Sequence, residues 1–146
     1  MILLVVLVWI HLLSVILWFG GSALMAFVIG PVLGATGSET RALTGNIAAR
    51  SHRYYAAAGG VAILSGLILA WLTGRFSSPL MWVVIVIAVF LAYWGAQITG
   101  RAADAIAAAN DAERPAAIAR MVRSGTIEIA GFVIAFTLMV LVRFGF

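Results

Sequence analysis

Residues 1–30 read MILLVVLVWIHLLSVILWFGGSALMAFVIG, a stretch without Asp, Glu, Lys or Arg in which His11 is the one ionisable side chain. About 20 apolar residues are enough for a helix to cross the hydrocarbon core of a bilayer. The stretch is longer than the apolar part of a signal peptide, and no positively charged segment precedes it. It therefore predicts a retained transmembrane helix over residues 2–31, ending at Gly30-Pro31.

The rest of the chain has the same apolar character. Of its 146 residues, 64% are hydrophobic and 10% are charged, whereas about a quarter of the residues in a soluble domain are charged. Three further apolar runs predict helices over residues 54–73, 79–110 and 116–143, and Pro79 suits the first position of a helix. Residues 41–53 form a possible amphipathic lead-in. We expect one all-α integral membrane domain, a four-helix bundle spanning residues 1–146.

The arginines predict the orientation of the bundle, because cytoplasmic loops carry an excess of Lys and Arg. Arg75 and Arg143 fall on one side of the predicted membrane. The other seven arginines fall on the opposite side, at Arg41, Arg50, Arg53, Arg101, Arg114, Arg120 and Arg123. This distribution favours an antiparallel bundle with both termini outside, located in the inner cell membrane.

Several function classes find no support in the sequence. The absence of cysteine excludes disulfides, thiolate metal sites and covalently attached haem. Signatures of hydrolases, zinc proteases and nucleotide-binding enzymes are missing. No basic patch with interleaved aromatic residues indicates a nucleic-acid partner. Whether the protein is an enzyme is left open.

His11 is the most informative residue, because it lies about 15 Å from the outer end of its helix at 1.5 Å per residue. Polar groups at such a depth are costly and often functional, and neutral imidazole is a common metal ligand. Counting depth in the other helices places Ser65 and Met139 nearby, and Trp18 follows on the same helical face. We therefore predict a cofactor site at His11, Trp18, Ser65 and Met139, with His11 as the metal ligand and Met139 as a soft ligand for haem or copper. The alternative is a structural His11, hydrogen-bonded to Ser65 or Thr137.

A second group of polar residues is predicted at the inner membrane interface. Glu128 is expected in the first turn of the fourth spanning segment, where the positive helix end favours a carboxylate, paired with Arg53, His52 or Arg101. This inner polar cluster comprises Arg50, His52, Arg53, Gln97, Arg101 and Glu128. It is either a salt-bridged interface that fixes topology or an anion site for carboxylates such as porphyrin propionates. Because His52 lies at a different level from His11, one metal bound by both is disfavoured.

Residues 9–13 (Trp-Ile-His-Leu-Leu), 18–21 (Trp-Phe-Gly-Gly) and Pro31 resemble the first helix of a superfamily of small bacterial four-helix membrane proteins. The superfamily includes the copper-resistance protein D family and the HemJ-type protoporphyrinogen oxidases. Residues 53–69, with Ser65-Gly66 where relatives often have Thr-Gly, resemble the second helix. The resemblance implies haem or porphyrin association through the helix-1 histidine in one family and copper handling in the other. The chain lacks the lysine used by HemJ-type proteins and the Met- or His-rich outer segment expected for copper collection, which favours a branch outside both families.

Three functions follow as expectations. The first is non-covalent binding of haem b through His11, for electron transfer or porphyrin handling. The second is copper handling or small-solute permeation along His11 and Met139, which would need an oligomer because four helices enclose little space. The third is a non-catalytic scaffold or accessory subunit. The expected partners are the lipid bilayer and either further copies of the chain or a redox partner.

Overall fold

The computed structural model describes residues 1–35 and 41–144, and within them all side chains except those of residues 33–35, 41–46, 48, 49, 52 and 107. All secondary-structure elements of the described residues are helical. They are α1 (Ile2–Leu24), the π-helical η1 (Met25–Ile29), α2 (Gly30–Ala35), α3 (Arg41–Leu72), the 3₁₀-helical η3 (Arg75–Ser77), α4 (Pro79–Trp94), the π-helical η4 (Gly95–Thr99), α5 (Gly100–Ala108) and α6 (Arg114–Phe144).

Four stretches are long and apolar enough to cross a membrane. They are Ile2–Val32, Arg53–Leu72, Pro79–Ile106 and Arg114–Phe144. Many large apolar side chains on them face outward, including Trp71, which is 75% exposed. Apolar exposure on this scale is rare in soluble monomers and is the expected surface of a protein embedded in lipid. The predicted all-α class and the four spanning helices are therefore confirmed, and the chain is a multi-pass membrane protein.

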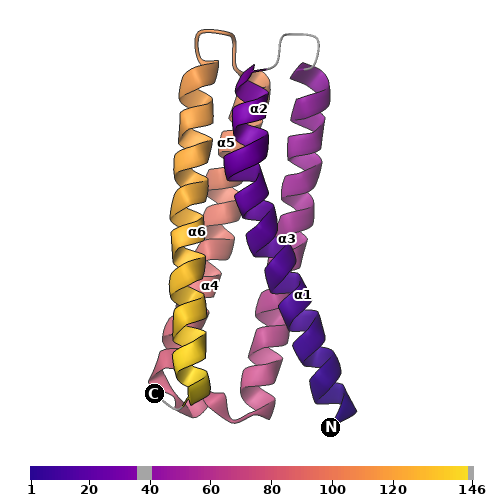
Figure 1. The fold of residues 1–146 in the computed structure, drawn as a ribbon, viewed down its shortest axis with the longest axis vertical. Helices are drawn as coiled ribbons and strands as arrows, with labels where there is room; N and C mark the ends of the chain where they lie inside the picture. The colour runs from indigo at the N-terminus through magenta and orange to yellow at the C-terminus, as the bar shows by residue number, and fades with distance from the viewer. Residues whose placement is uncertain (36–40, 145–146) are drawn as a thin grey trace.

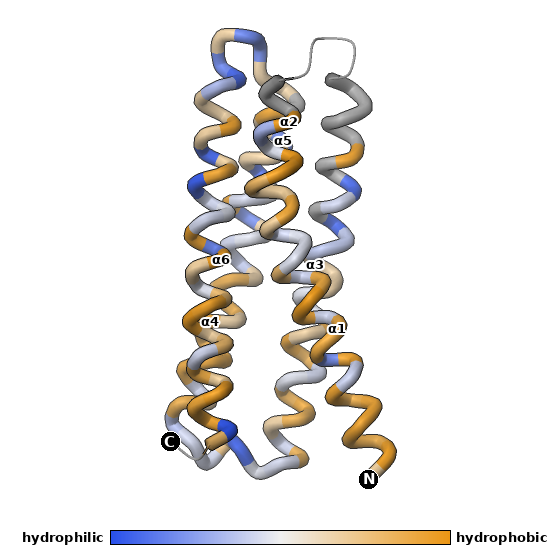
Figure 2. Tube along the Cα trace, in the orientation of Figure 1, coloured by the Kyte–Doolittle hydropathy of each residue, from blue (hydrophilic) through white to orange (hydrophobic). Residues whose placement is uncertain are grey.

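These four stretches, here called rods in chain order, lie side by side in a bundle (Figure 1), with both chain termini at one end. The helix α1 packs mainly against α3, and α4 packs mainly against α6. Hydrophilic residues gather at the end opposite to the termini, while the middle of the bundle is apolar (Figure 2). The predicted lead-in is part of α3, which begins at Arg41 well before residue 54.

The connection between α3 and α4 is a short turn in which glycine and proline occupy positions typical of helix ends. Gly74 adopts a left-handed conformation with φ of 68°, a backbone geometry that glycine reaches without steric cost. Pro79 occupies the first turn of α4, as predicted. This short turn between α3 and α4 lies at the end of the bundle that carries both termini (Figure 1).

Two of the four rods contain a π-helical segment, η1 in the first rod and η4 in the third. Such segments shift the register of a helix and occur often at functional sites. Ser22 lies one turn before η1, and Thr99 is the last residue of η4. Both side chains contact the same residue of α6, Glu128.

Candidate functional site

His11 lies on the side of α1 that faces α3. Its Nδ1 atom is 2.9 Å from the carbonyl oxygen of Ala62. Because a carbonyl oxygen can only accept, Nδ1 carries the proton and donates, so the neutral ring keeps its lone pair on Nε2. Histidines that bind metals commonly show this arrangement, with one ring nitrogen anchored on a carbonyl.

Ser65 supports this arrangement from one turn further along α3. Its hydroxyl lies 3.3 Å from His11 Nδ1 and donates to the backbone at Val61 or Ala62, at 2.6 and 3.1 Å. Gly66 provides the space for the ring, because a Cβ atom at this position would lie 2.9 Å from His11 Cε1. Thr137, the other hydroxyl considered for His11, donates instead to Val133 on its own helix. The structure thus brings His11 and Ser65 together as the sequence predicts.

A cavity of about 250 Å³, here called the His11 cavity, lies beside this ring. It is mostly apolar, and it reaches the end of the bundle that carries the termini, because Thr73, Arg75 and Arg143 line it. Met139 lines it from α6, so His11 and Met139 share one cavity, as the depth count predicts. Trp18 also lines it, although this side chain is 6% exposed and packs edge-on against Phe132, with ring centroids 4.8 Å apart.

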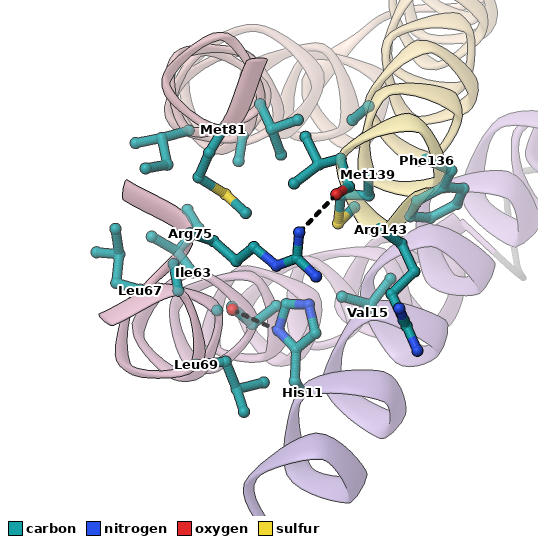
Figure 3. A pocket seen from close by; sticks show the side chains of 18 of the residues that line it. His11, Val15, Ile63, Leu67, Leu69, Arg75, Met81, Phe136, Met139 and Arg143 are labelled. Atoms are coloured by element: carbon teal, nitrogen blue, oxygen red, sulfur yellow. Dashed lines mark hydrogen bonds between the residues drawn. The ribbon is translucent and has the colours of Figure 1, made fainter. Parts of the chain in front are cut away.

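Arg75, Arg143 and Met81 also line this cavity, and the sequence did not predict them there. Figure 3 shows Arg75 reaching into the cavity from its loop, with its guanidinium group between His11 and Met139 in this view. Its Nη1 atom donates to the carbonyl oxygen of Val142 at 2.9 Å, and no described carboxylate forms an ion pair with it. Met81 adds a second thioether from α4. The sequence signal for Arg75 was its position next to Gly74, because glycine permits the left-handed conformation of this turn.

The predicted inner polar cluster does not form as one group. Glu128 is 2% exposed and accepts hydrogen bonds from Ser22 Oγ at 3.0 Å and Thr99 Oγ1 at 3.2 Å. Neither Arg53 nor Arg101, two of the three predicted partners, pairs with it, and the side chain of the third, His52, lies outside the described residues. The physical reason for the missing arginine pairs is the length of α6. It begins at Arg114, so Glu128 lies deep in the helix and not in a first turn.

The other members of the predicted cluster occupy different surfaces. Arg50 and Arg53 are exposed on α3. Gln97 and Arg101 line a separate groove of about 470 Å³ together with Arg120 and Arg123, here called the arginine groove. The side chain of His52 lies outside the described part of the structure. An anion site built from all six predicted residues is therefore not formed.

Glu128 faces a second, smaller cavity of about 120 Å³, here called the Glu128 cavity. It is lined by Ser22 of α1, Tyr55 of α3 and Thr99 of η4, among others. Trp18 lines both this cavity and the His11 cavity. The bundle interior therefore holds two polar sites, one at His11 and one at Glu128, with the Trp18 indole between them.

Among the described residues, no group of three or more His, Cys, Asp or Glu side chains is placed to hold a metal ion. Any metal at His11 would thus depend on the methionines or on ligands carried by a cofactor. No protein-family model, curated protein or solved structure matches this chain.

Proposed function

We propose that this protein is a membrane-embedded haem b protein in which His11 Nε2 would bind the haem iron. The observation that carries the proposal is the hydrogen bond from Nδ1 to Ala62, which fixes the ring and leaves the lone pair on Nε2, beside a cavity and without a hydrogen-bond partner among the described residues. When bound, haem would supply one-electron redox chemistry within the bilayer. We propose further that the bundle is antiparallel in the inner cell membrane, with the Arg75 end outside, as the arginine distribution indicates.

The donor set of the His11 cavity suits a porphyrin. Met139 would offer a thioether in the same cavity, and a thioether is a known ligand of haem iron. The guanidinium groups of Arg75 and Arg143 are suited to pair with propionates. Propionate binding is thus proposed at Arg75 and Arg143, and no longer at the inner polar cluster. The cavity volume of about 250 Å³ is below the roughly 300–1,000 Å³ of typical ligand pockets. Haem binding would therefore require the side chains that line the cavity to move apart.

The test is the absorption spectrum of the full chain, expressed with haem supplementation and purified in detergent. We expect a Soret band that His11→Ala abolishes, because it removes the axial ligand. His52→Ala removes the chain's other histidine and should leave the band intact. Met139→Leu should retain haem but lower its midpoint potential, since a Met ligand raises that potential. A colourless wild-type preparation would refute haem binding.

Copper handling is the second candidate, and the observation that favours it is the presence of Met81 and Met139 in the cavity of His11. Thioether and imidazole ligands together suit Cu(I). The guanidinium of Arg75 in the same cavity repels a bare cation, so copper ranks second. Metal analysis separates the two, because a copper site would retain copper and show no Soret band. A preparation free of both haem and copper would leave the scaffold function.

A further inference from the structure

Glu128 is a buried carboxyl group inside a membrane-spanning helix, and the haem proposal makes no use of it. Ionisable groups at such positions are costly and are usually functional. Its two oxygens accept from Ser22 and Thr99, and no described cation neutralises it. Burying this carboxyl group costs free energy, which indicates that Glu128 has a function beyond packing.

The hydrogen bonds around Glu128 continue away from it in one direction. Thr99 Oγ1 lies 2.8 Å from Ser124 Oγ, and the indole nitrogen of Trp94 donates to Ser124 Oγ at 3.0 Å. Because the Thr99 hydroxyl donates its hydrogen bond to Glu128, it can only accept one from Ser124. Ser124 Oγ is therefore the donor to Thr99 Oγ1. Ser124 and Thr99 thus form a hydroxyl relay whose donors all point toward the carboxylate.

The hydroxyl relay begins at the arginine groove. Ser124 and Trp94 line this groove together with Arg101, Arg120 and Arg123. At its other end, Glu128 faces the Glu128 cavity of about 120 Å³. A water molecule needs about 10–15 Å³ of such space, so this cavity has room for several waters. The buried carboxyl is therefore connected by polar atoms to a surface groove.

We propose that Glu128 is an intramembrane proton-binding site supplied from the arginine groove through Ser124 and Thr99. A proton arriving at Ser124 Oγ releases the Ser124 proton to Thr99 Oγ1, and the Thr99 proton passes to Glu128 Oε2. Each hydroxyl ends with one proton, and one proton has moved from the groove to the carboxylate. This function goes beyond haem binding and does not require it.

The surroundings of Glu128 favour a proton over a metal cation. The polar side chains that line its cavity with it are Trp18 and Ser22 of α1, Tyr55 of α3 and Thr99 of η4. Among the described residues that line this cavity, Tyr55 is the one other titratable group, and none is a basic residue. Ca²⁺ takes about 6–8 oxygen ligands, whereas the carboxyl and its two hydroxyl partners offer four. A proton needs a single lone pair.

The first arm of the test is infrared difference spectroscopy of the full chain in lipid vesicles, between acid and alkaline pH. We expect a carbonyl band of a protonated carboxylic acid that shifts in D₂O and is lost in Glu128→Gln. Asp104→Asn, which removes an exposed acid on α5, should retain the band. A carboxyl group ionised throughout the pH range would overturn the proposal. A signal that follows Na⁺ at constant pH would also overturn it, in favour of a cation site.

The second arm keeps Glu128 and breaks the hydroxyl relay, so it remains decisive if Glu128→Gln fails to fold. Thr99→Val and Ser124→Ala should slow the D₂O exchange of the Glu128 band at least tenfold. The matched control is Thr126→Val, which removes an exposed hydroxyl that bonds back to Val122 on the same helix. Exchange as fast in the relay variants as in this control would refute the proton path.

Discussion

His11 faces one cavity of the bundle and Glu128 faces another, and the hydrogen bonding of these two ionisable groups differs. His11 Nδ1 donates a hydrogen bond to the carbonyl oxygen of Ala62, and the lone pair on Nε2 lies beside the His11 cavity of about 250 Å³. The Glu128 carboxyl has both oxygens engaged by hydroxyl donors and faces about 120 Å³. The first arrangement leaves a coordination position open, whereas the second satisfies the charged group.

This difference indicates which kind of ligand each site is able to bind. A lone pair beside a mostly apolar space suits a large ligand with a metal centre, with Arg75 available for its anionic groups. A carboxylate enclosed by hydroxyls has no room for such a ligand, and its hydrogen bonds lead to the arginine groove. Trp18 lines both cavities, so it is the residue whose loss should affect both sites.

The largest effect is expected from Trp18→Ala. Replacing a buried Trp by Ala costs about 3–5 kcal/mol, and here it also merges the two cavities. We expect a lower midpoint of thermal unfolding in detergent, together with changes in both the Soret band and the Glu128 carbonyl band. Trp9→Ala is the control on the same helix, because Trp9 is 61% exposed. Equal destabilisation by the two variants would show that Trp18 does not divide the interior.

A smaller and site-selective effect is expected from two matched glycine variants. In Gly66→Ala the new Cβ would lie 2.9 Å from His11 Cε1, and in Gly95→Ala it would lie 2.9 Å from Glu128 Oε1. Overpacking of this kind costs about 1–3 kcal/mol. Gly66→Ala should weaken the Soret band and leave the Glu128 carbonyl band unchanged, and Gly95→Ala should do the reverse.

Gly60→Ala provides the control for this pair, because nothing lies within 4 Å of a Cβ atom at that position of α3. It should leave both spectroscopic signals unchanged. If either glycine variant altered both signals equally, the two sites would be parts of one coupled unit and the comparison would fail.

The smallest effect is expected from Arg75→Gln, which removes the positive charge from the His11 cavity. Loss of a propionate partner should weaken haem affinity about tenfold, equivalent to about 1.4 kcal/mol, as measured by haem titration. Arg123→Gln, in the arginine groove, should have no such effect. If the cavity binds copper instead, Arg75→Gln should strengthen binding, because it removes a repulsive charge.

The sequence predicted the His11 site better than the Glu128 site. Counting 1.5 Å per residue was enough to place Ser65 and Met139 at the level of His11, because regular helices convert sequence distance into depth. For Glu128 the first turn was counted from the apolar run that begins near Thr126, whereas α6 begins at Arg114, close to the start predicted at residue 116. Ser22 and Thr99 carried no signal as its partners, since both are small hydroxyl residues in apolar helices.

Four membrane-spanning helices, the turn at Gly74-Arg75 and the position of His11 along its helix were determined by the sequence itself. Hydropathy, proline placement and helical rise are local properties, so one chain segment is enough to specify them. The tertiary structure decided which polar side chains meet. Those contacts depend on helix rotation and on the register shifts at η1 and η4. That is why Ser22 and Thr99, which are 77 residues apart, both donate to Glu128.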